Sequence, residues 1–262
     1  MLQKLMIYNA RQLKIFKNVK RREWVRQNRL REPYIKQFTG RLKNYFNKLG
    51  NGLAEDFSFG STIMLEIRQN NSFNELANIF RVQYRVVANA FKNNMLNREQ
   101  NVKDFESDFE LELERYINDN VGTLVVGIND TTKAKIQNVI NNNFGNGEGI
   151  NSTGNEIRNA IIGMGVLRAN LIARTEVHRT TSFANEMVAE NMGIAGTRKE
   201  WVAVADGRTR ATHIQATGQQ VGLEEPFIVG GDRLKYPGDP AGSPGETINC
   251  RCVSIYTTPD FL

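Results

Sequence analysis

The side chains best suited to chemistry in this 262-residue chain gather near its C-terminal end. Cys250 and Cys252 are its two cysteines, and His213 is one of its two histidines. Thiolates and imidazole are ligands that zinc prefers, and a carboxylate of Asp206 or Asp239 would complete a tetrahedral set. The sequence therefore offers a candidate structural zinc site made of His213, Cys250 and Cys252 with either aspartate.

The Cys-x-Cys spacing also fits a simpler arrangement. It lacks the turn that the Cys-x-x-Cys of a zinc knuckle makes, and buried free thiols pack well as small hydrophobic groups. If Cys250 and Cys252 lie on a strand, they point to the same side at roughly 6.5 Å, which is poor geometry for a disulfide. Metal ligands and buried free thiols both remain open.

A catalytic interpretation of the same region competes with these. Asp206, Arg208, Arg210 and His213 could perform acid–base chemistry on a phosphodiester. The sequence shows no second nearby histidine and no paired acidic residues to complete a nuclease metal site. A turn at Asp206, with the arginines paired to other aspartates, is the explanation that we prefer. We predict no catalytic residues.

These residues must be positioned by a chain whose hydrophobic pattern is mostly helical. Apolar spacing of three and four predicts helices over 34–49, 72–96, 102–116, 130–144 and 152–193, with stops or breaks at Gly50-Asn51-Gly52 and Gly163-Met-Gly165. Strands are predicted at 200–204, 226–229 and 250–256, and a short helix at 209–217. The predicted class is α+β, with a helical N-terminal domain (1–149) and a C-terminal α+β module (150–262) that a long helix leads.

The net charge of +6 is distributed unevenly. Residues 1–50 form a basic arm with 14 lysines and arginines against two glutamates. Such a segment suits a phosphate backbone or an acidic protein surface, although a solvated helix face is an equally simple explanation. The residues that we expect to bind DNA or an acidic partner are Lys14, Lys17, Lys20, Arg21, Arg22, Arg26, Arg29 and Arg31.

An acidic helix offers a rival partner for the basic arm. The helix predicted over 102–116 carries six acidic residues on its outer side, from Asp104 to Glu114. It could pair with the arm of the same chain or of another copy. On a later helix, Arg174 and His178 lie one turn apart on one face, for which a polar contact between helices is a sufficient explanation.

The ordered motifs of the C-terminal part resemble the phage Mu F-like head morphogenesis family, the minor head proteins of tailed phages. The resemblance rests on Ala173-Arg-Thr-Glu176, Lys199-Glu-Trp201, Asp206-Gly-Arg-Thr-Arg-Ala-Thr-His213, Gly230-Gly231, Pro237-Gly-Asp239 and Asn249-Cys-Arg-Cys252. It covers roughly the last hundred residues; the helical N-terminal half has no such likeness.

The resemblance implies a non-enzymatic protein of the virion, inside the phage head or at its portal vertex. It would bind the portal protein, and it could contact other copies of itself or packaged double-stranded DNA. The rival class is a metal-assisted nuclease or toxin-like enzyme carried in the head, with Asp206 and His213 at its centre. Apolar runs well short of the roughly 18 residues of a spanning helix predict no membrane span, and an N-terminus unlike a secretory signal predicts synthesis in the host cytoplasm.

Overall fold

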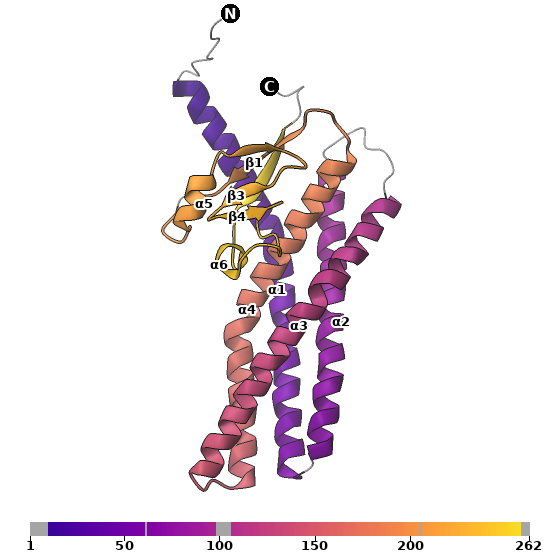
Figure 1. The fold of residues 1–262 in the computed structure, drawn as a ribbon, viewed down its shortest axis with the longest axis vertical. Coiled ribbons are helices and arrows are strands. Elements are labelled where there is room, and N and C mark those ends of the chain that lie inside the picture. Colours follow the sequence, from indigo (N-terminus) through magenta and orange to yellow (C-terminus); the bar gives the residue numbers. More distant parts are fainter. Residues whose placement is uncertain (1–9, 61, 98–105, 205, 258–262) are drawn as a thin grey trace, which may run out of the picture.

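The computed structural model describes residues 10–60, 62–97, 106–204 and 206–257, leaving aside the side chains of residues 10–17, 62–66 and 69. Four long helices form an elongated bundle, and a small module of short elements packs beside its upper end (Figure 1). The helices are α1 (Ala10–Ser58), α2 (Thr62–Leu96), α3 (Glu106–Gly145) and α4 (Ile150–Asn191). The predicted α+β class, with a long helical body and a small C-terminal module, is confirmed.

One hydrophobic core runs along the bundle. On α1, the apolar positions Phe38, Leu42, Phe46, Leu49 and Leu53 recur at steps of three and four and are all buried. They pack with apolar residues of α2, α3 and α4, and the most extensive helix pairing is that of α1 with α4. The domain boundary at 149/150 stays a prediction, but α4 shares this core with the three helices before it.

The glycines predicted to end or break helices lie inside continuous helices. α1 passes through Gly50 and Gly52 to Ser58, and α4 passes through Gly163 and Gly165. A Cβ at Gly50 would lie 3.1 Å from the carbonyl oxygen of Arg158, and one at Gly165 would lie 2.4 Å from the Cβ of Phe46. These two glycines therefore allow α1 and α4 to approach closely, and the predicted stops were wrong.

The predicted helix starts were also wrong where they relied on local capping residues. α2 begins at Thr62, ten residues before the expected cap Ser72. α3 runs from Glu106 through Asp130 to Gly145, so the two helices predicted there are one. α4 begins at Ile150 after Gly149, which makes no side-chain cap. Burial along a continuous apolar face outweighs these capping signals, each of which contributes only about 1 kcal/mol.

The module contains two small antiparallel sheets and two short helices. Its elements are β1 (Arg198–Val202), α5 (Ala211–Ala216), β2 (Gln220–Gly222), β3 (Phe227–Val229), β4 (Asp232–Leu234), α6 (Pro244–Thr247) and β5 (Val253–Thr257). One sheet has the order β2-β1-β5 and the other joins β3 to β4. The strands predicted at 200–204 and 226–229 correspond to β1 and β3, whereas β2 and β4 were not predicted.

Buried polar contacts hold the module on the bundle. Lys199 of β1 forms a fully buried ion pair with Glu186 of α4, and Tyr256 of β5 donates to the same carboxylate at 2.8 Å. Arg179 of α4 donates to the hydroxyl of Thr247 in α6 at 3.1 Å. Because these partners are removed from solvent, the module has a defined position on α4.

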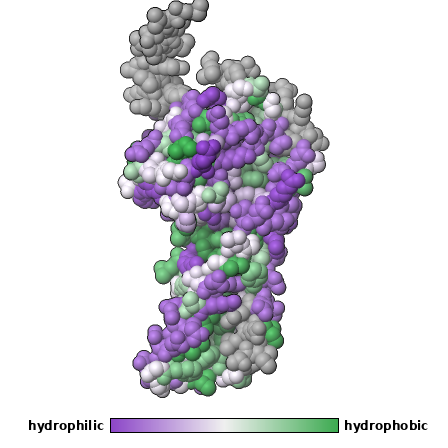
Figure 2. Space-filling view, in the orientation of Figure 1, coloured by the Kyte–Doolittle hydropathy of each residue, from purple (hydrophilic) through white to green (hydrophobic). Residues whose placement is uncertain are grey.

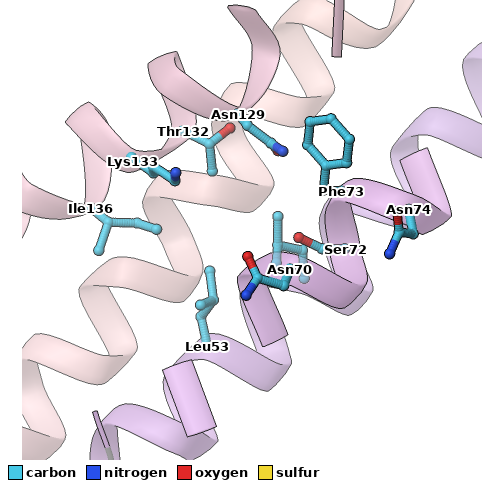
Figure 3. A pocket seen from close by; sticks show the side chains of 10 residues that line it. Leu53, Asn70, Ser72, Phe73, Asn74, Asn129, Thr132, Lys133 and Ile136 are labelled. Atoms are coloured by element: carbon cyan, nitrogen blue, oxygen red, sulfur yellow. The ribbon is translucent and has the colours of Figure 1, made fainter. Parts of the chain in front are cut away.

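The surface and the helices carry three further features. Hydrophilic residues cover most of the visible face of the module, while hydrophobic patches are interspersed along the helical stalk (Figure 2). Within the described ranges, no helix has an apolar stretch long enough to cross a membrane. A cavity of about 240 Å³ is lined by side chains of α1, α2 and α3 (Figure 3). Among the described residues that line it, Lys133 is the charged one.

Candidate metal centre

Three predicted metal ligands come together in the module. The ligand atoms of His213, Cys250 and Cys252 all lie within 4.8 Å of one another. The His213 Nδ1 atom is 3.2 Å from the Sγ of Cys252 and 3.7 Å from the Sγ of Cys250. All three side chains are buried, and both cysteines are free thiols. The arrangement offers a divalent ion two sulfurs and one imidazole nitrogen.

Local backbone geometry places the cysteines at this point. The strand predicted over 250–256 begins only at Val253, so both cysteines precede β5. Asn249 has φ of +57°, a left-handed conformation that asparagine tolerates better than most residues. The turn at Asn249 thus brings Cys250 under α5, the short helix that carries His213.

Glu246 orients the imidazole from the opposite side. Its Oε2 atom lies 2.9 Å from the Nε2 of His213 and also accepts a hydrogen bond from Thr212 at 2.8 Å. When Nε2 donates to this carboxylate, Nδ1 presents its lone pair to the sulfurs, which is the tautomer that ligation requires. Burial by itself lowers the pKa of His213, but Cys250 and Glu246 together outweigh it and the net shift is upward.

An apolar shell surrounds the three residues. The rings of Trp201 and His213 meet edge to face with centroids 5.4 Å apart, and Phe227 meets Trp201 in the same way. Both cysteines belong to this hydrophobic core of the module. They therefore pack as small apolar groups and at the same time face a histidine.

The aspartates considered as fourth ligands belong to other contacts. Asp206 accepts two hydrogen bonds from Arg251, at 2.7 and 2.9 Å, and this pairing holds its pKa well below the ordinary range. Asp239 accepts from the main-chain nitrogens of Lys235 and Ala241, at 2.7 and 3.0 Å, and so closes a loop. Neither carboxylate is part of the group formed by the cysteines and His213.

Apart from the contacts that Arg208 makes with Asp206, the residues of the catalytic interpretation are held by separate partners. Asp206 is paired with Arg251, whereas His213 faces Glu246 and Cys252. Arg210 donates to the main-chain oxygen of Ile248 at 2.6 Å. Asp206, Arg210 and His213 thus each have a partner that stabilises the local fold. No two of them are placed as a nucleophile and its general base.

The basic arm contacts the module. Lys20 pairs with Glu200 of β1, and Arg26 pairs with Glu23 at 2.6 Å. Arg31 is buried and donates to the hydroxyl of Thr181 at 2.7 Å. Burial lowers the pKa of Arg31 to about 10, an effect that Cys250 and Cys252 oppose.

Lys20, Arg26 and Arg31 thus contribute to intramolecular contacts rather than to an open basic surface. Of the other residues predicted to bind DNA or an acidic partner, Arg21, Arg22 and Arg29 are exposed. The side chains of Lys14 and Lys17 lie outside the described residues.

Acidic side chains of α3 pair within the bundle instead of with the arm. Glu114 binds Arg85 of α2 through two contacts of 2.8 Å. Glu106 and Glu110 both face Lys92, also on α2. These three glutamates therefore pair with α2. Pairing of the acidic face with the basic arm of another copy stays a prediction.

Sequence reasoning missed the residues that dock α1 on the module. The indole of Trp24 and the amide of Gln27 donate to the main-chain oxygens of Arg251 and Ser254. Together with Lys20 and Arg31 they recur at steps of four, three and four. That spacing marks one face of a helix and was the available signal.

Comparisons with known proteins find a family model and relatives for the C-terminal part of the chain. A family model described as Phage Mu protein F like protein matches residues 134–255. Minor head protein GP7 of Bacillus phage SPP1 is 35% identical over 96 residues, 36% of this chain and 30% of the relative. An NAD(+)–arginine ADP-ribosyltransferase EFV of Enterococcus faecalis is 38% identical over 87 residues, 32% of this chain and 18% of the relative.

The chain thus spans less than a third of either relative's length. No solved structure matches it. The family match begins within α3, includes all of α4 and ends in β5, so it contains the cysteines, His213 and both of the aspartates considered above. The resemblance to the phage Mu protein F like family is thus confirmed over the C-terminal part of the chain, residues 134–255.

Proposed function

We propose that this protein is a minor head protein of a tailed phage or phage-derived particle, with a non-enzymatic role in head morphogenesis. The observation that carries the proposal is the family match over residues 134–255, together with the likeness to a protein named as a minor head protein. The proposed location is the virion, in the head interior or at the portal vertex, and the proposed main partner is the portal protein.

The geometry supports a role in assembly more than one in catalysis. The charged residues around the cysteines are engaged with one another or with the main chain, as in the pair of Asp206 with Arg251. The module is held on the bundle by buried contacts, which suits a rigid adaptor between larger components.

Co-expression with the portal protein of the same phage tests this proposal. Co-purification of the two proteins, and detection of this chain in assembled particles by mass spectrometry, are the expected results. Absence of the chain from purified particles would refute the location. Nuclease activity that a chelator or His213→Ala abolishes would instead favour the enzyme class.

The exposed part of the basic arm is the proposed contact surface for packaged DNA or for acidic portal residues. We choose Arg21 and Arg22 for the test because both side chains are exposed. If they contact DNA phosphates, replacing both by glutamine lowers the slope of log affinity against log salt by about two. The matched control neutralises Lys36 and Lys43, which are exposed farther along α1. Equal effects of the two double variants would indicate only a general charge effect and would contradict this surface.

We further propose that His213, Cys250 and Cys252 bind a structural zinc ion. Two thiols and an imidazole within 4.8 Å support this, as does the carboxylate of Glu246 behind the imidazole. Elemental analysis of purified protein is expected to give one zinc per chain. The zinc content is expected to fall in Cys250→Ser and Cys252→Ser. Metal-free wild-type protein that takes up no zinc on titration would refute the proposal.

A further inference from the structure

A second buried histidine lies beside the three proposed ligands. His178 of α4 is only 2% exposed, and neither of its ring nitrogens has a hydrogen-bond partner among the described residues. A buried imidazole carries both a donor and an acceptor, or two donors when it is charged, and leaving such a group without a partner is unfavourable. The buried position of His178 therefore favours a bound ligand, such as a metal ion, as the missing partner of its ring.

His178 lies near Cys250. The Cys250 thiol is close enough to Cys252, His178 and His213 for each of them to affect its pKa, and no hydrogen bond joins it to His178. The main-chain nitrogen of Asn249, the residue before Cys250, donates to the Thr175 hydroxyl at 3.0 Å. Since Thr175 lies one turn before His178 on α4, this bond holds the cysteine segment against the helix next to the imidazole.

The other side of the imidazole is closed by a loop. A Cβ at Gly238 would lie 2.7 Å from the Cδ2 atom of His178 and 3.1 Å from its Nε2. Gly238 also has φ of +84°, a conformation that glycine adopts without strain. The loop thus packs its main chain against one ring edge, and the edge opposite carries Nδ1.

We propose that His178 is the fourth ligand of a tetrahedral centre that Cys250, Cys252 and His213 complete, and that zinc is the ion it takes. The proposal rests on the zinc site proposed above. His178 stands outside the group of three within 4.8 Å, so ligation draws the imidazole and Cys250 together. The ion would then join α4, α5 and the segment before β5, and so fix the module to the bundle.

Cobalt substitution tests this assignment, because Co²⁺ reports its ligands in visible spectra. The full chain is loaded with Co²⁺ and compared with two variants. In His178→Gln, we expect weaker tetrahedral bands. We also expect a loss of affinity beyond the roughly 100-fold that an outer partner of a ligand supplies. In His178→Cys, we expect the tetrahedral bands to persist with added thiolate-to-cobalt absorption, because the new side chain replaces one ligand by another.

Glu246→Gln is the matched control, since it alters the residue behind His213 without removing a ligand. Its affinity is expected to fall by about 10- to 100-fold, with tetrahedral bands retained. Thermal melts of each metal-free variant identify any that do not fold.

The outcomes separate the two proposals. If wild type binds Co²⁺ and His178→Gln has wild-type affinity and spectrum, His178 is not a ligand and the three-residue site remains. If His178→Cys adds no thiolate absorption, His178 is likewise excluded. If wild type binds neither Co²⁺ nor Zn²⁺, both proposals fail.

Discussion

The indole nitrogen of Trp24 donates a hydrogen bond to the main-chain oxygen of Arg251, with 2.8 Å between the two atoms. This bond joins α1 to the residue between the two cysteines. The amide of Asn28 reaches the same oxygen at 3.4 Å, and that of Gln27 donates to Ser254 at 3.3 Å. The basic arm thereby supports the cysteine segment through uncharged polar side chains, in addition to the ion pair that Lys20 makes with Glu200 of β1.

Trp24→Phe is expected to destabilise the protein by about 1 kcal/mol, because it removes the donor and keeps an aromatic ring. The free energy of unfolding in denaturant measures this change. Val25→Ala, on the neighbouring exposed position, is the control and is expected to stay within about 0.5 kcal/mol of wild type. Equal values for both variants would contradict a role for this bond.

Arg251→Gln is expected to lower Tm more than Arg208→Gln does. Both arginines reach Asp206, but Arg251 does so through two hydrogen bonds of 2.7 and 2.9 Å and its side chain is 18% exposed. Arg208 makes one contact of 3.5 Å and is 74% exposed, where solvent weakens an ion pair. Calorimetry of the two variants gives the comparison; the reverse order would show that the paired geometry is not stabilising.

The sequence was most informative where residue type determines chemistry. The chain has only two cysteines and two histidines. The meeting of both cysteines with His213 in one site could therefore be predicted from residue type and spacing. Asp206 and Asp239, which the sequence offered as a fourth ligand, lie outside this group because short polar side chains also serve turns, which is what both do here. His178 lies on a helix remote in sequence, and only the packing of the module on α4 brings it near Cys250.

Helix type was predictable, but helix length was not. The apolar spacing on α1 follows from residues such as Phe38, Leu42 and Phe46, and these are buried as expected. In a sequence, a glycine within such a pattern can indicate either the end of a helix or a site where two helices approach closely. Only the facing helix distinguishes them, and at Gly50 and Gly165 the facing atoms are those of α4 and α1.

Gly165→Ala and Gly163→Ala are expected to change stability in opposite directions. A Cβ at Gly165 would lie 2.4 Å from the Cβ of Phe46, an atom that cannot move without the helix, so we expect a loss of about 1–3 kcal/mol. Gly163 is exposed with nothing within 4 Å of an added Cβ. Alanine there should stabilise the helix by up to about 1 kcal/mol. Denaturant unfolding of both variants tests this; destabilisation by Gly163→Ala would contradict an open site.

The buried pair of Glu186 and Lys199 predicts a specific pH dependence. Burial raises the pKa of Glu186 from 4.5 to about 7, although Lys199 and Tyr256 act in the opposite direction. The folded state therefore binds the proton of Glu186 more tightly than the unfolded state does. The contribution of this group to stability is full below about pH 4.5 and is lost as pH rises through about 7.

Glu186→Gln removes this titration, so the unfolding free energy of wild type minus that of the variant should fall between about pH 5 and pH 7. The fall is at most about 1.4 kcal/mol per pH unit. Tyr256→Phe removes a hydrogen bond to the ionised carboxylate, so it should raise the pKa of Glu186 and move the end of this window to higher pH. Denaturant unfolding at several pH values measures both effects. A difference between wild type and Glu186→Gln that does not change with pH would show that the carboxylate titrates alike in both states.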